Sequence, residues 1–281
     1  MSRHSRDSVG AFSNRTVVLA LLLLVGGGVT ASAGQTACLE NGGSEEFHYK
    51  WRLRGGLSWI ARIAFPTSGV AVMETSQDDE KMLSSVLEIS VPSRPDFYRY
   101  ESEIDPADDR TMMTNHSYRW GGRERHDRTE FDYEKGLSRR ERQKEDSVDK
   151  SIRQIPKAPL MDVLTGIQFL RTSADEIQEE FDTEIYSDGK FYQVSFRPVP
   201  REYFAFGGET WRTRCFEIVA AKNAREPWSG GLKVCLTDDD RRIPFLISIK
   251  QGRLASLELT IEGIGPCDEK TVASVVEKAH R

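Results

Sequence analysis

The feature that most constrains the fold is an alternation of apolar and polar residues near the start of the chain. From Phe47 to Leu53, every second residue is apolar and each residue between them is polar. A period of two places all the apolar side chains on one face of a β-strand, because successive side chains point to opposite faces. Gly55 and Gly56 predict a turn, after which the alternation resumes from Leu57 to Phe65. We therefore expect two strands with one buried face.

Strand-like segments continue along most of the chain. Shorter and partly charged runs lie at 70–73, 86–91, 97–101, 118–120 and 130–133. Asp188-Gly189 and Gln251-Gly252 each separate two such runs and predict further hairpins. Many consecutive hairpins indicate an antiparallel sheet that is curved or barrel-like rather than doubly wound. We expect a single, mainly β domain over residues 34–281.

Two segments interrupt this pattern. Residues 134–158 carry charges of both signs and few apolar residues. We interpret this charged insertion as a solvated loop or an exposed helix, with a basic docking surface as the alternative. Pro159 then opens a predicted helix at 160–171 whose apolar residues recur at helical spacing on one face. These residues are Leu160, Val163, Leu164, Ile167 and Leu170.

The first 33 residues have the layout of a secretory signal peptide. Basic residues precede an apolar run at 17–25, and the small residues Ala31, Ser32 and Ala33 follow it as a cleavage site. The run is shorter than the roughly 20 apolar residues that span a bilayer. An uncleaved anchor and a lipoprotein acylated at Cys38 are the alternatives. We expect cleavage after residue 33, a periplasmic location and no membrane span in the mature protein.

The four cysteines all lie after the predicted signal peptide. An even number of cysteines in an exported protein predicts disulfides, with three possible pairings. Cys215 and Cys235 lie on two strand-like runs, and a hairpin symmetric about residue 225 places them opposite each other. Cys38 and Cys267 would then pair by elimination. The spacings do not match those of a zinc site or a redox motif, so we interpret these cysteines as structural.

The sequence contains no recognisable catalytic motif. It has no H-E-x-x-H zinc motif, no G-x-S-x-G elbow and no Walker loop. The acidic run 238–240 leads into Arg241 and Arg242, and we interpret it as a solvated turn rather than a calcium site. A net charge of −5 with 38% apolar residues argues against a disordered chain and a strongly basic nucleic-acid binder. We expect no catalytic residue, no metal, no cofactor and no nucleic-acid partner.

The aromatic residues of the first two predicted strands indicate a possible ligand site. Trp51, Trp59 and Phe65 share one face of these strands. Ordinary core packing is the simpler interpretation. However, a curved sheet covered by one helix has a concave apolar face, and hydrophobic ligands bind to such faces. We predict that these three residues line a cavity and that Leu164 and Ile167 form its lid.

Three segments carry a resemblance to a known family. They are the helical segment 162–171, the run 236–244 with its acidic turn before Arg, an apolar residue and Pro, and the opening strand with Gly55-Gly56. They resemble an uncharacterised family of bacterial exported proteins, the domain-of-unknown-function family numbered thirty-one hundred and eight. The resemblance extends over about residues 45–262. It implies a half-open antiparallel β-barrel around a short helical insertion, similar to the periplasmic carriers that shelter the acyl chains of lipoproteins. It implies no catalytic residue.

Three classes of function are consistent with these observations. The first is a non-enzymatic periplasmic protein of the cell envelope that binds a lipid or another hydrophobic ligand in the half-barrel. The second is an envelope interaction or assembly protein with a packed core, which works through charged residues such as those at 134–157. The third is an enzyme that uses the cavity for a small aromatic substrate, because a fold does not determine a function.

Overall fold

The computed structural model describes residue 39 and residues 43–55, 66–144, 147–156, 159–251 and 255–265. The predicted signal peptide and the predicted site residues Trp59 and Phe65 lie outside this part of the chain, as do Cys38 and Cys267. The described part is mainly β, as predicted, with one sheet of 15 strands. In these residues, no helix is both long enough and apolar enough to cross a bilayer.

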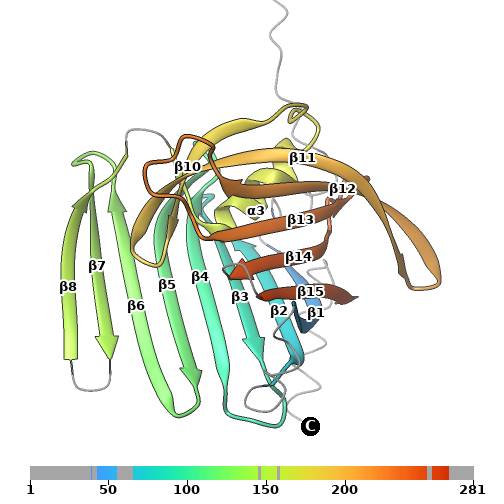
Figure 1. Cartoon of the computed structure of the whole chain (residues 1–281), viewed down its shortest axis with the longest axis horizontal. Helices are drawn as coiled ribbons and strands as arrows, with labels where there is room; N and C mark the ends of the chain where they lie inside the picture. Colours follow the sequence, from blue (N-terminus) through green and yellow to red (C-terminus); the bar gives the residue numbers. More distant parts are fainter. Residues whose placement is uncertain are drawn as a thin grey trace, which may run out of the picture. The chain divides into compact units, whose positions relative to one another are not determined.

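The first eight strands form a meander in which each strand pairs antiparallel with the next (Figure 1). They are β1 (Ser44–Arg54), β2 (Ser68–Gln77), β3 (Leu83–Ser90), β4 (Phe97–Asp105), β5 (Arg110–Trp120), β6 (Arg123–Asp132), β7 (Leu137–Lys144) and β8 (Ser147–Gln154). The alternation that opens the sequence is realised in β1, where Phe47, Tyr49 and Trp51 are buried.

A second group of strands completes the sheet. It comprises β9 (Leu160–Met161), β10 (Phe181–Ser187), β11 (Lys190–Phe206), β12 (Glu209–Ala220), β13 (Gly230–Thr237), β14 (Pro244–Gln251) and β15 (Ala255–Ile264). The short β9 pairs parallel with β10, and each later pair is antiparallel. The first strand of one group pairs with the last strand of the other, β1 with β15, so both groups belong to one continuous sheet.

The connectivity forces this sheet to curl. Its two edges are β8 and β9, and only residues 155–159 connect them. Five extended residues reach less than about 20 Å, so the edges must come near each other. The β9 edge approaches β5, where the amide of Asp162, directly after β9, donates a hydrogen bond to the Thr111 hydroxyl (2.9 Å). The hydroxyl of Tyr133, just after β6, lies near the carbonyls of both Thr111 (2.6 Å) and Leu160 (3.5 Å). No ladder joins β8 to β9 in the described residues, so the sheet remains open.

The helix α3 (Val163–Ser173) occupies the concave side of the sheet. It begins three residues later than predicted, because Leu160 and Met161 form β9 and Asp162 caps the helix by accepting a hydrogen bond from the amide of Thr165 (2.7 Å). Leu164, Ile167 and Leu170 are fully buried, as their spacing predicts. They pack into one apolar cluster with side chains from both groups of strands.

The charged stretch at 134–158 is a β-hairpin, so the expectation of a loop or an exposed helix is wrong. Its residues form β7 and β8 at one edge of the sheet. All eight residues of β8 are exposed. Strands were predicted from an alternation of apolar and polar residues. An edge strand with water on both faces does not need this alternation, so its sequence did not identify it as a strand. Cross-strand ion pairs such as Glu141–Lys150 (2.8 Å) occupy these positions instead.

The later predicted hairpins are confirmed. The first is not, because the strand expected at 57–65 lies outside the described residues and β1 pairs with β2 and β15 instead. Asp188-Gly189 joins β10 to β11, with Ser187 opposite Lys190. Cys215 and Cys235 lie opposite each other on β12 and β13 and form a disulfide. The strands β14 and β15 also pair antiparallel, as predicted for the runs around Gln251-Gly252.

Candidate ligand-binding site

The described residues that we predicted to line a cavity come together in the structure. Trp51 is 2% exposed, and Leu164 and Ile167 are fully buried in the same apolar cluster. The indole nitrogen of Trp51 donates a hydrogen bond to the carbonyl of Ser90 (2.9 Å), so its polar atom is also satisfied. Neighbouring side chains therefore already fill the space between the sheet and α3 around these three residues.

The face of β1–β8 that carries these buried side chains, here called the inner face, changes character from strand to strand. Residues directly opposite each other on adjacent strands point to the same face. The register gives one such row across seven strands, which runs through Phe47, Met73, Leu87, Tyr100, His116, Asp127 and Arg142. The row begins apolar, becomes aromatic at β4 and β5, and ends charged at β6 and β7. A parallel row at the next inner position runs through Tyr98, Tyr118, Arg125 and Lys144.

His116 lies at the boundary between the apolar and the charged parts of this face. Its ring centroid is 3.9 Å from that of Tyr100 and 5.8 Å from that of Tyr98. Burial lowers the pKa of His116 to about 3, so the imidazole is neutral at pH 7. Its Nε2 atom is buried and has no hydrogen-bond partner among the residues that the structure describes.

Buried hydroxyl groups and a carboxyl group continue the polar part of the inner face toward α3. Asp162 accepts hydrogen bonds from Ser102 and from the amide of Thr165. Burial raises the pKa of Asp162 and outweighs these hydrogen bonds, which lower it. Burial also raises the pKa of Tyr100, and the neighbouring Asp162 raises it further. The capping residue of the helix is thus part of a buried polar cluster.

Three arginines at the far end of the inner face surround one carboxylate. Arg125, Arg140 and Arg142, here called the arginine cluster, lie 2.8, 3.1 and 3.2 Å from Oδ1 of Asp188. Asp127 is buried beneath them and pairs with Arg142 at 2.8 Å. Burial raises the pKa of Asp188, but its hydrogen bond from Arg125 and the charges of the cluster outweigh burial and lower it.

Asp188 belongs to the turn between β10 and β11, so these contacts connect β6 and β7 to that turn across the opening of the sheet without a ladder. The hydroxyl groups of Thr129 and Tyr186 are 2.7 Å apart and add a second link between β6 and β10. The Asp188 side chain is 70% exposed, whereas those of the arginines are 15–22% exposed. The guanidinium groups are held in place, while their partner carboxylate remains open to exchange with water and solutes.

A separate cavity of about 280 Å³ lies against the β10–β11 hairpin. Its lining comprises Glu184, Phe191, Tyr192, Gln193, Arg225 and Glu226. Burial raises the pKa of Glu184, and its Oε2 atom is buried without a hydrogen-bond partner in the described part of the chain. The volume is near the lower limit of ligand pockets, roughly 300 Å³, and suits a small molecule rather than a long acyl chain.

Two of the segments that carry the family resemblance meet at the end of α3. Arg171 is fully buried and donates hydrogen bonds to the carbonyls of Arg242 (3.2 Å) and Arg241 (3.4 Å). It also pairs with Glu45 at 2.7 Å, which connects the helix to β1. We did not predict this contact. The sequence did contain an indication that Arg171 is buried. It follows Leu164 by seven residues, which places it on the apolar face of the helix. These contacts join the end of the helix to β1 and to the turn before β14.

Comparisons with known proteins agree with this fold. No curated protein matches the chain. A solved structure described as "Crystal Structure of Beta-barrel-like Protein of Domain of Unknown Function DUF1849 from Brucella abortus" is similar, with a TM-score of 0.53 and 9% sequence identity over 80% of this chain and 98% of that chain. At this identity the similarity shows a shared fold alone. Residues 53–253 match the family described as "Protein of unknown function (DUF3108)". This match covers more than half of the sequence, and the chain therefore belongs to that family.

Proposed function

We propose that the protein is a non-enzymatic, periplasmic protein of the cell envelope that binds a lipid or a similar amphipathic ligand on the inner face of its half-open barrel. One observation supports this function above all. The inner face passes from apolar Leu87 through Tyr100 and His116 to Arg142 within neighbouring strands. An acyl chain matches the apolar end of such a row, and an anionic headgroup matches the cationic end.

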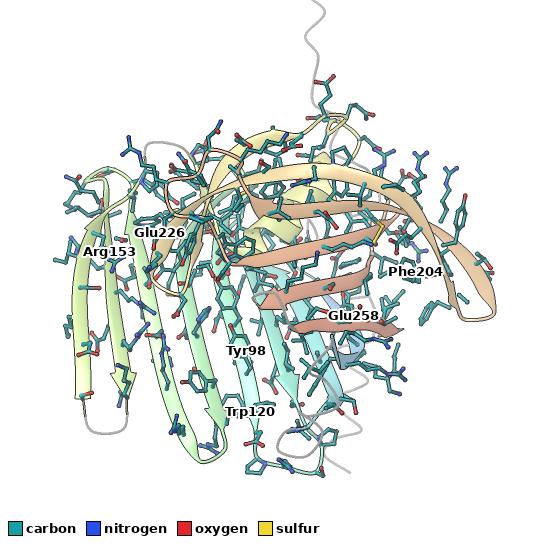
Figure 2. All side chains as sticks on the ribbon, in the orientation of Figure 1. Tyr98, Trp120, Arg153, Phe204, Glu226 and Glu258 are labelled. Atoms are coloured by element: carbon teal, nitrogen blue, oxygen red, sulfur yellow. A yellow bond between two sulfur atoms is a disulfide. The ribbon has the colours of Figure 1, made fainter. Side chains whose placement is uncertain are left out.

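The position of the acyl chain follows from the packing of the core. Trp51, Leu164 and Ile167 are closed in by their neighbours, so a ligand reaches them only if side chains move. Tyr98 and Trp120 are only partly buried and pack against the margin of the same apolar cluster. Figure 2 shows both side chains on β4 and β5. We place the chain of the ligand against Tyr98 and Trp120, with its innermost end toward the predicted lining residues.

The headgroup position follows from charge. The arginine cluster brings three positive charges against the carboxylates of Asp127 and Asp188. Asp127 is buried, whereas Asp188 is exposed. A phosphate or carboxylate headgroup can therefore take the place of Asp188 at the arginines without uncovering a buried charge, and Arg favours such groups because it binds them bidentately.

Native mass spectrometry of the purified protein, followed by organic extraction, tests this function. We expect a co-purifying lipid mass in the wild type and its loss in Trp120→Arg, which introduces a charge at the chain position. The matched control is Ile152→Arg, which adds the same charge on β8, where the side chain is 65% exposed. An apoprotein mass that stays unchanged when a short-chain phosphatidylglycerol is added would refute the proposal.

An interaction or assembly function is the second candidate. The feature that favours it is β8, which exposes every residue to solvent and lies within the charged segment that we predicted for this role. In this case, replacing Ser147–Gln154 by a short linker abolishes the capture of an envelope partner by the tagged protein. The wild type and the shortened protein then both give a lipid-free mass.

A further inference from the structure

The strand β8 ends the sheet with an open edge. Among the described residues it pairs with β7 alone. Two of its apolar side chains are exposed, Val148 by 52% and Ile152 by 65%. The backbone N–H and C=O groups of an edge strand form a template for another strand. Neither the ligand site nor the arginine cluster uses this edge, so it calls for a separate explanation.

We propose that β8 pairs antiparallel with β8 of a second copy of this chain, about a two-fold axis through Ser151, so that the two sheets become continuous. A two-fold contact requires a strand whose sequence complements itself. With the axis at Ser151, Asp149 of each copy lies opposite Arg153 of the other, which gives two pairs of opposite charge. Lys150 lies opposite Ile152, whose side chain packs along the aliphatic part of the lysine.

Other antiparallel registers lack this complementarity. An axis at Lys150 sets that residue against its own copy and places like charges opposite each other. An axis at Asp149 likewise sets like charges opposite each other, and an axis at Ile152 forms no pair of opposite charge. An axis between two residues is excluded, because it would place an inner-face side chain opposite an outer-face one. Directly opposed like charges destabilise a ladder, and opposite charges stabilise it. Within one copy, Asp149 contacts Lys144 at 3.4 Å with both side chains largely exposed, and this contact allows Asp149 to accept a second cation.

The pairing also has a geometric consequence for the inner face. Arg142 lies opposite Asp149 and Arg140 opposite Ser151, so the charged pairs of the proposed contact lie on the inner face. The row that ends at Arg142 would continue across the two-fold axis into the second copy. This inference is independent of the ligand, because the edge is open whether or not a lipid is bound.

Charge exchange tests the contact directly. We expect sedimentation equilibrium of the full protein to show a dimer, and Asp149→Arg or Arg153→Asp to raise its dissociation constant by about tenfold. The double variant Asp149→Arg/Arg153→Asp restores both pairs and should restore the dimer. The control Asp79→Arg makes the same charge change in the exposed turn between β2 and β3 and should leave the dimer intact. A monomer at all concentrations, or a dimer that neither single variant weakens, overturns the proposal.

Cysteine cross-linking tests the register. Ser151→Cys lies on the axis opposite itself, at a distance that a disulfide can bridge. We expect a covalent dimer on non-reducing gels for Ser151→Cys. We expect little or none for Lys150→Cys, because residue 150 lies opposite Ile152 of the second copy and two residues away from residue 150 of that copy. Stronger cross-linking of Lys150→Cys contradicts this register. Because all β8 side chains are exposed, both variants should keep the thermal unfolding temperature of the wild type.

Discussion

Two regions of the same sheet differ in what holds them together. The covered region, β1–β3 and β13–β15 with α3 between them, buries apolar side chains from both groups of strands. The extension, β6–β8, is held by its backbone ladders and by ion pairs such as Lys144–Asp149 (3.4 Å), and its last strand has no buried residue. Each exposed ion pair contributes at most about 1 kcal/mol, whereas one buried aliphatic side chain contributes about 1.5–3 kcal/mol.

Because of this difference, the covered region provides most of the stability of the sheet, and the extension provides exposed groups for recognition. Strands in the covered region cannot separate without exposing the core, so we expect them to unfold together in one cooperative transition. The extension buries less surface and should open locally at a lower free-energy cost. The side chains of its last strand, β8, are all exposed, which leaves them available to partners. The sheet thus combines a stable part and an adaptable part, joined through the inner face at β4 and β5.

The largest contrast is expected between two arginines. Arg171→Met removes the partner of Glu45 in the covered region and should lower the free energy of unfolding by about 3–5 kcal/mol, because a buried charge is left unpaired. Arg142→Met in the extension should cost less, about 1 kcal/mol, because Arg125 and Arg140 remain beside Asp127 and this buried carboxylate keeps two cationic partners. Urea unfolding of both variants gives the two values. Equal losses would show that the extension is as tightly integrated as the core.

A matched pair of isoleucines should give the next largest contrast. Ile167 on α3 is fully buried and Ile152 on β8 is 65% exposed. Ile167→Ala should destabilise the protein by about 2–5 kcal/mol through lost burial and the cavity that it leaves. Ile152→Ala should change the stability of the monomer by no more than about 0.5 kcal/mol. Urea unfolding at a low protein concentration measures both changes without a contribution from association.

The smallest effect concerns the boundary between the two regions. Burial lowers the pKa of His116 from 6.5 to about 3, so between these values the unfolded chain binds a proton that the folded protein does not. Stability should therefore fall as the pH drops below about 6.5, with a slope of at most about 1.4 kcal/mol per pH unit. His116→Phe keeps a ring beside Tyr100 and removes this titration. Urea unfolding between pH 7.5 and 4 should show a shallower decline for the variant, and parallel curves would contradict the assignment.

Local patterns in the sequence predicted much of the fold outside the extension. The alternation in β1, the hairpin at Asp188-Gly189 and the opposition of Cys215 and Cys235 depend on neighbouring residues, and all three are confirmed. The helix was predicted from its apolar spacing, with a start displaced by three residues. Short-range periodicity determines these features, so one sequence is sufficient to find them.

The extension and the inner face could not be predicted in the same way. The strands β7 and β8 carry no apolar period, because an edge strand in water does not need one. The row from Leu87 to Arg142 depends on the register of four successive strand pairs. A bulge at Met112 on β5, opposite Glu103 and Ile104 of β4, shifts that register locally. Its exact alignment is therefore a property of the folded sheet rather than of any short segment. Whether Trp51, Leu164 and Ile167 contact a ligand stays a prediction.

The pairing of β1 with β15 has a consequence for how the chain reaches its native state. Trp51 pairs with Leu259 and Phe47 with Ile264, so the two strands lie at opposite ends of the described sequence. The first strand emerges early in synthesis, and one of its two edges has no partner until the last strand is complete. Closing so long a loop is entropically costly and slow. We therefore expect the final step of folding to wait for the carboxyl-terminal strand, and chains truncated before Ala255 to aggregate through the exposed edge of β1.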